Sequence, residues 1–195
     1  MLSEHLKKKS LFYRLYTIDK ETAERLKKEP CQHCGGPLHF SNYYRKPRGE
    51  PEGIQQEYFL QFSLCCGKEG CRKRRQCPSC RFLGRKVYWF SVILSIVSDW
   101  QNGHLPDTFL RLSTTTGISR QTIKRWIMFF HDIFPTSKLW KKLRGQVSAS
   151  VNNTDLPSNL INYYLSLKSC ATEVLVSCLI FLSGKPESHQ KIRAR

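Results

Sequence analysis

The sequence is poor in acidic residues. Its 195 residues include 15 aspartates and glutamates against 32 lysines and arginines, which gives a formal net charge of +17. An imbalance of this size points to a polyanionic partner, most often nucleic acid. The positive charge is also clustered: residues 65–90 hold eight basic residues and one acidic residue, and residues 111–144 hold the same numbers. Surface lysines that served only solubility would not need this clustering.

Clustered carboxylates are missing as well. Two-metal hydrolysis needs several carboxylates gathered on a sheet core. After Phe134 the acids are Asp155, Glu173 and Glu187, scattered over about sixty residues. No grouping of His, Asp and Glu has the spacing of a hydrolytic site. We therefore expect a protein that is not an enzyme.

Long hydrophobic runs are absent too. A membrane span requires about twenty apolar residues, and the nearest candidate, residues 160–183, is interrupted by Lys168 and Glu173. The first ten residues lack the apolar stretch of a secretory signal peptide. We therefore expect a cytoplasmic protein with no membrane partner. In that compartment paired cysteines indicate metal ligands rather than disulfides.

Cysteine, in contrast, is abundant. Seven of the nine cysteines lie between residues 31 and 80. Cys31 and Cys34 form a Cys-x-x-Cys turn followed by Gly35 and Gly36, which lets two thiolates and the nearby N–H groups face one ion. Thiolates in tetrahedral geometry favour zinc. The pattern predicts a zinc ribbon with Zn²⁺ as its cofactor.

The second ligand pair has two candidates. Cys66 and Cys71 follow a strand-like run at residues 58–64 and have glycines between them, so we favour this pair. Cys77 and Cys80 have the shorter Cys-x-x-Cys spacing but no trailing glycine, and they could replace the first pair or form a second site. Cys65 should point to the opposite side of the strand from Cys66. Cys170 and Cys178, on an apolar segment, are predicted to be buried.

The expected fold class is α+β: a small zinc ribbon of short antiparallel strands, then an all-α helix-turn-helix region. A short helix from about Asp19 should end before Pro30, a loop should cover residues 43–53, and a buried helix should cover residues 87–100. The domain boundaries are predicted as follows: a helical lead-in at 1–29, the ribbon at 30–85, the helix-turn-helix region at 86–140, a linker at 141–159, and a C-terminal helix with a basic tail at 160–195.

Residues 109–128 fit a helix-turn-helix unit. Gly117 falls in the turn, where a left-handed residue is needed, and Ser119 is a good N-cap for the second helix. The interior positions are all apolar: Leu112, Ile118, Ile123 and Trp126. The outward positions carry side chains that can bond to base edges and phosphates in a major groove, namely Ser119, Arg120, Gln121, Lys124 and Arg125. A structural hairpin with a solvated basic face is the alternative.

Further basic residues should contact DNA phosphates. In the ribbon these are Arg72, Lys73, Arg74, Arg75, Arg85 and Lys86. Beyond the second helix, the sequence adds Lys138, Lys141, Lys142 and Arg144. Such contacts set affinity and position rather than sequence preference.

The order of these motifs resembles the DNA-binding front end of insertion-sequence transposases, which join a zinc ribbon to a helix-turn-helix. The resemblance covers roughly residues 30–135 and includes Thr-Gly-Ile-Ser-Arg-Gln-Thr-Ile-Lys-Arg-Trp at residues 116–126. Two features depart from it, namely the long insertion between the cysteine pairs and the Cys77–Cys80 pair. The resemblance implies DNA binding and a mobile-element origin, without the carboxylate nuclease domain of those enzymes.

The sequence therefore predicts a zinc-containing, sequence-reading DNA-binding protein, with DNA and a transposase or recombinase as partners. One alternative is an accessory fragment of a nuclease or recombinase whose active site a partner completes. Another is a zinc-ribbon module that binds proteins. The DNA sequence preference, the choice between transposition and transcriptional control, and the oligomeric state do not follow from these motifs.

Overall fold

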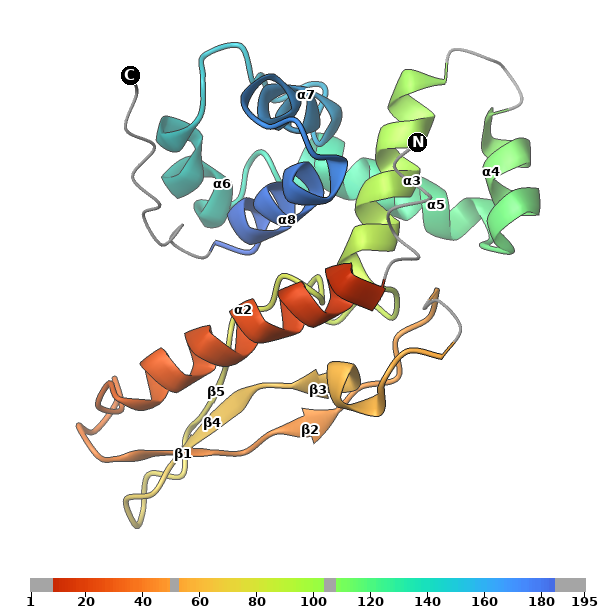
Figure 1. The fold of residues 1–195 in the computed structure, drawn as a ribbon. Helices are drawn as coiled ribbons and strands as arrows, with labels where there is room; N and C mark the ends of the chain where they lie inside the picture. Colours follow the sequence, from red (N-terminus) through yellow and green to blue (C-terminus); the bar gives the residue numbers. More distant parts are fainter. Residues whose placement is uncertain (1–8, 50–52, 104–107, 185–195) are drawn as a thin grey trace. The chain divides into compact units, whose positions relative to one another are not determined.

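The computed structural model describes residues 9–49, 53–103 and 108–184 (Figure 1). The chain divides into two compact units. One ends at Phe90 and is called the N-terminal unit; the other begins at Ser91 and is called the C-terminal unit. The first is mixed α and β and the second is helical, so the chain is of the α+β class.

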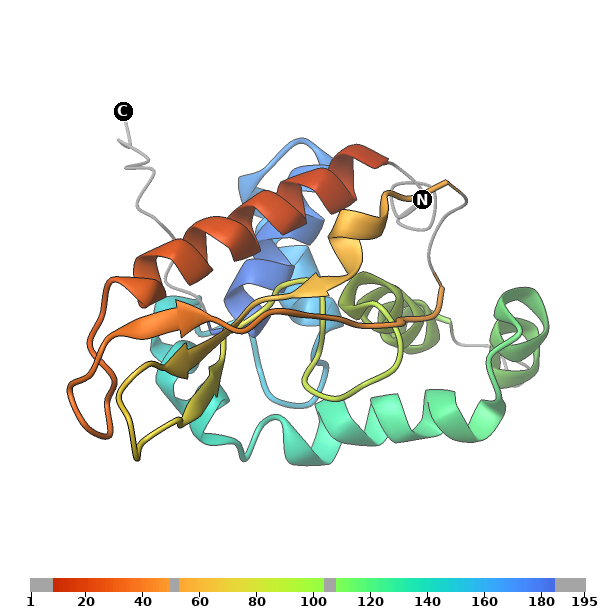
Figure 2. The same ribbon diagram turned by 90° about the horizontal axis from the view of Figure 1, so that it is seen from below.

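The N-terminal unit combines one long helix with two small antiparallel sheets. Helix α2 spans Lys9–Lys27. The strands are β1 (Leu38–Phe40), β2 (Tyr43–Tyr44), β3 (Leu60–Gln61), β4 (Ser63–Cys66) and β5 (Arg74–Gln76). They form a three-stranded sheet in the order β1-β4-β5 and a two-stranded sheet of β2 and β3. Helix α2 contacts β1 and β4 and runs along one face of the sheet (Figures 1 and 2).

Helix α2 is longer than the helix that we expected from Asp19. The buried residues of this helix include Leu11, Leu15, Ala23 and Leu26. They are spaced four, eight and three residues apart, which places them on one helical face. Ala23 and Leu26 pack in a core cluster with the sheet residues Leu38, Phe62, Leu64 and Cys66. The helix therefore extends as far as it can bury this face.

Two other predicted elements differ from the structure. The strand expected at residues 58–64 begins as a 3₁₀ turn, η1, at Gln56–Phe59. The carbonyls of Tyr58 and Leu60 accept hydrogen bonds from Arg81, which draws this part of the chain toward Arg81. The predicted loop at residues 43–53 also begins too early, because Tyr43 and Tyr44 pair with Gln61 and Leu60 in a strand.

The C-terminal unit is a set of short helices. They are α3 (Phe90–Asn102), α4 (Thr108–Thr116), α5 (Arg120–Met128), α6 (Lys138–Leu143), α7 (Ser158–Leu167) and α8 (Ala171–Leu182). A π-helical turn, η2, covers Phe129–Ile133, and a 3₁₀ turn, η3, covers Arg144–Gln146. After η3 the chain contributes the fully buried Val151 and Leu156 to the core.

The final helix that we expected across residues 160–183 is two helices. Lys168 is extended at the end of α7, and Cys170 precedes α8 in an extended conformation. The break allows α8 to fold back on α7, and the two helices pack together. One continuous helix could not bury both apolar segments against each other. The break also exposes Cys170, against our prediction, whereas Cys178 is buried.

Within the described ranges, none of the helices has the length and apolar character that crossing a membrane would require.

Candidate functional site

Four cysteines of the N-terminal unit converge on one point. Each of Cys31, Cys34, Cys66 and Cys71 offers its sulfur, and the four sulfurs lie within 4.8 Å of one another. The Cys34 and Cys66 sulfurs are 3.4 Å apart, and those of Cys31 and Cys71 are 4.0 Å apart. Four sulfurs bonded to one tetrahedral zinc ion would lie about 3.8 Å apart. The geometry therefore suits one metal ion.

Two tight turns deliver these sulfurs. In the first, the Gly35 N–H donates to the Cys31 carbonyl and the Cys31 N–H donates to the Gly36 carbonyl. The second turn leaves the end of β4, where Cys66 pairs with Leu38 of β1. In it, the Cys71 N–H donates to the Lys68 carbonyl. The sheet thus holds one turn against the other.

The thiols of Cys31 and Cys66 differ in pKa, and the thiolate forms of the cluster would be stabilised by a bound cation. The N–H groups of His33 and Cys34 lower the pKa of the Cys31 thiol to about 7. The Lys68 N–H acts in the same direction on Cys66, but burial and the other three cysteines outweigh it and raise the pKa of the Cys66 thiol to about 12. Thiolates held this close repel one another, and a bound cation removes that repulsion.

A glycine provides the space for this packing. A Cβ at Gly36 would lie 3.1 Å from the Cys66 sulfur, 3.4 Å from the Cys34 sulfur and 2.8 Å from the Lys68 Cβ. Any side chain at this position would push the two turns apart. Position 36 therefore belongs to the metal centre although it supplies no ligand.

The first testable prediction concerns this glycine. Gly36→Ala should weaken metal binding on the order of ten-fold or more, because the added methyl displaces the ligand sulfurs. Gly145→Ala is the matched control, since a Cβ there meets nothing within 4 Å. Competition with a chromophoric chelator measures both affinities. Equal zinc affinity in the two variants would contradict the packing argument.

Cys77 and Cys80 are not among the four clustered cysteines. Across the described ranges, the cluster of Cys31, Cys34, Cys66 and Cys71 is the one group of three or more potential ligands close enough to share an ion. Cys77 packs in the core cluster beside the sheet. The Cys80 sulfur lies 3.1 Å from Asp19 Oδ1 and 3.5 Å from the Leu15 carbonyl. Cys65 lies on the other side of β4 from Cys66, near the Arg72 carbonyl.

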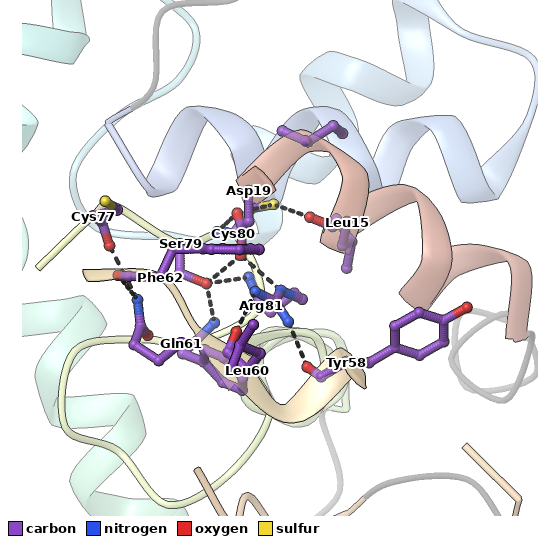
Figure 3. Close-up of polar contacts among 12 residues, drawn as sticks. Leu15, Asp19, Tyr58, Leu60, Gln61, Phe62, Cys77, Ser79, Cys80 and Arg81 are labelled. Atoms are coloured by element: carbon purple, nitrogen blue, oxygen red, sulfur yellow. Dashed lines mark hydrogen bonds and ion pairs between the residues drawn. The ribbon is translucent and has the colours of Figure 1, made fainter. Parts of the chain in front are cut away.

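Asp19 and Arg81 form a buried ion pair beside Cys80 (Figure 3). Arg81 Nε donates to Asp19 Oδ2 at 2.7 Å, and both side chains are at most 1% exposed. Asp19 also accepts from the Cys80 N–H at 2.9 Å and from the Ser79 hydroxyl. The Arg81 guanidinium donates to the carbonyls of Tyr58 and Leu60. This network joins α2, the 79–81 turn and η1.

This network was not predicted from the sequence. A signal was present: Asp19 lies on the buried face of α2, together with Leu15, Thr22 and Ala23. An acid on such a face requires a cationic partner. Which of the many basic residues would supply it depends on the tertiary fold.

The basic residues of the N-terminal unit that were predicted to contact DNA differ in their exposure to solvent. Arg72, Lys73, Arg74 and Arg85 are exposed. Arg75 is half-buried, and its Nη1 lies 3.0 Å from Glu29 Oε2. Lys86 is also half-buried. Because Arg74 and Arg75 are successive residues of β5, their side chains point to opposite faces of the sheet.

Helices α4 and α5 of the C-terminal unit pack together across the turn at Gly117. Gly117 has a φ of +66°, as we expected for the turn. The Ser119 hydroxyl accepts from the Thr122 N–H at 3.3 Å and so caps α5. The predicted interior residues are buried, namely Leu112, Ile118, Ile123 and Trp126. The predicted outward residues are exposed, namely Ser119, Arg120, Gln121, Lys124 and Arg125.

Comparison of the chain with protein-family models, with curated proteins and with solved structures gives no match.

Proposed function

We propose that this chain is a zinc-containing DNA-binding protein of transposase-related type that reads sequence through α5 and performs no catalysis of its own. The DNA-binding part of this proposal rests on α5, which has one buried face and one exposed face. Ile123 and Trp126 anchor the helix in the unit, whereas Arg120, Gln121 and Lys124 face solvent. Side chains of these types recognise base edges and phosphates when a helix enters the major groove.

Zinc is the metal that this proposal assigns to the cysteine cluster. An all-sulfur tetrahedral set suits zinc or iron, and a structural zinc site has four protein ligands and no open position. Cys31, Cys34, Cys66 and Cys71 would fill all four positions. Zinc would thereby hold the two cysteine turns together and form a zinc ribbon on the β1-β4-β5 sheet.

The second testable prediction is a loss of sequence discrimination. Selection from random duplex first identifies a preferred site. Arg120→Ala should then weaken binding to that site by about 1–3 kcal/mol and leave random duplex nearly unaffected, because base-edge contacts carry discrimination. Lys141→Ala, an exposed basic residue of α6, is the matched control and should weaken both duplexes equally if it contacts phosphate.

Fluorescence anisotropy at fixed salt measures both affinities. Equal losses on the two duplexes for Arg120→Ala would make α5 a phosphate contact rather than a reading helix. No loss on either duplex would remove α5 from the interface.

A further inference from the structure

The strands of the N-terminal unit form one long ribbon with two distinct faces. Leu38 pairs with Cys66 and Tyr44 pairs with Leu60 in one continuous register. The Ser41 N–H donates to the Ser63 carbonyl between the two sheets, so the alternation of side chains continues across the junction. Even-numbered residues of β1 to β4 therefore share one face, and odd-numbered residues share the other.

The even-numbered face packs against α2 at its β1–β4 end. Leu38, Leu64 and Cys66 are buried in the core cluster with α2. At the end of α2, the Lys27 ammonium lies 4.9 Å from the centre of the Phe40 ring on this face. The apolar and aromatic groups at the β1–β4 end of this face thus have partners within the unit, whereas Tyr44, at the β2 end of the same face, is 60% exposed.

The opposite face of the ribbon carries exposed aromatic and basic side chains. We call it the outer face and define it by His39, Tyr43, Arg74 and Gln76. His39 pairs with Cys65, and Cys65 pairs with Arg74, so these three form one row across the sheet. His39, Arg74 and Gln76 are exposed, and Tyr43 is 45% exposed, whereas Gln61 and Ser63 of the same face are buried.

The backbone beneath His39 keeps its ring on this face. A Cβ at Gly67 would lie 2.5 Å from His39 Nε2, so the imidazole rests against the glycine at the start of the second cysteine turn. Tyr43 lies four residues away along the same edge, about 13 Å at the rise of an extended strand. The two rings are thus far enough apart to stack on different bases.

The charge on this side is positive. The strand residues of the outer face include no acid, and the adjoining turn adds Lys68, Arg72 and Lys73 against one acid, Glu69. Exposed aromatic rings among cations are the features that bind unpaired nucleic-acid strands, because rings stack on bases while cations hold phosphates. A duplex keeps its bases stacked inside and offers no base face to Tyr43.

We propose that the outer face binds single-stranded DNA, with Tyr43 and His39 stacking on bases and Arg74 contacting a phosphate. The inference rests on the proposed function, DNA binding, and extends it to a second form of DNA that is bound by a surface other than α5. It also divides the basic residues of the ribbon: Arg74 contacts DNA, whereas Arg75, on the other face beside Glu29, does not.

The chain supplies an unusually close control for the test. Tyr43 and Tyr44 are consecutive and both exposed, but lie on opposite faces, and the same alternation separates Arg74 from Arg75. The third testable prediction compares Tyr43→Ala/Arg74→Ala with Tyr44→Ala/Arg75→Ala in the full chain. The first pair should raise the Kd for a short labelled single-stranded DNA by about ten-fold or more. The second pair should leave it unchanged.

Two further readouts identify the contact. Arg74→Ala alone should flatten the plot of log K against log salt by about 0.7, the value for one phosphate contact on a single strand. Affinity for duplex should be unchanged in Tyr43→Ala. Zinc content equal to that of the unmodified chain shows that each variant keeps its fold.

Several outcomes would overturn the inference. Equal losses from the two double variants would mean that the faces do not differ. Equal losses on duplex and single strand would reduce the outer face to a phosphate contact. Binding of an RNA strand of the same sequence, without binding of the DNA strand, would reject the chosen partner. Duplex binding without any single-strand binding would overturn this inference alone, whereas failure to bind either form would overturn the proposed function.

Discussion

Cys66→Ser should abolish stoichiometric metal binding and unfold the N-terminal unit. Cys66 is fully buried, is one of the four clustered sulfurs and packs in the core. Structural zinc contributes about 10–16 kcal/mol in zinc-finger peptides, so its loss exceeds what a small core can replace. Metal analysis of the purified chain should give about one equivalent of zinc before the substitution and none after it.

Two neighbouring cysteines serve as controls. Cys65→Ser changes the adjacent residue on the opposite side of β4 and should retain the metal. Cys80→Ser should also retain it, because the Cys80 sulfur lies against Asp19 and the Leu15 carbonyl. Full zinc retention in Cys66→Ser together with loss in Cys80→Ser would instead assign the second ligand pair to Cys77 and Cys80. Two equivalents in the unmodified chain would reveal a further site.

The metal-ligand set could be predicted because its determinants are local. Two residues between Cys31 and Cys34 and glycines directly after them define a turn whatever the rest of the chain does. The choice of Cys66 and Cys71 needed one further step, the strand that precedes them. The four sulfurs do come together, and the identity of the metal remains part of the proposal.

The features that the sequence did not predict depend on contacts between distant segments. Asp19 and Arg81 are 62 residues apart, and the sequence around each residue does not identify the other as its partner. The different faces of Arg74 and Arg75 follow from the register of β5 on β4, and a run of four basic residues contains no information about register. The break at Lys168 lets α8 pack on α7, a contact that the pattern of residues 160–183 did not indicate.

The helical hairpin of α4 and α5 could be predicted in part. Gly117 and Ser119 mark the turn locally, and the apolar positions around them are buried as predicted. These residues specify two packed helices with a capped second helix. They do not specify what the exposed side of α5 binds, because exposed arginine and glutamine suit both solvent and DNA. That distinction requires the measurement of sequence discrimination.

Asp19→Ala should destabilise the N-terminal unit by about 3–5 kcal/mol. Removing the carboxylate leaves the Arg81 charge fully buried without its partner, and this is the costly way to break a buried ion pair. It also removes the acceptor for the Cys80 N–H and the Ser79 hydroxyl. Urea denaturation of the full chain, followed by hydrogen–deuterium exchange in peptides from residues 9–49, reports the stability of this unit.

Glu29→Ala is the control for the buried pair, because it breaks an ion pair of the same unit at the surface. The Arg75 and Glu29 side chains are 33% and 45% exposed, and pairs of this kind contribute about 0.2–1 kcal/mol. Similar small losses in both variants would contradict a structural role for the Asp19–Arg81 pair.

Arg81→Lys tests the geometry of the pair separately. Lysine keeps the charge but cannot contact Asp19 and the two carbonyls of Tyr58 and Leu60 at once, so this variant should keep only part of the stability.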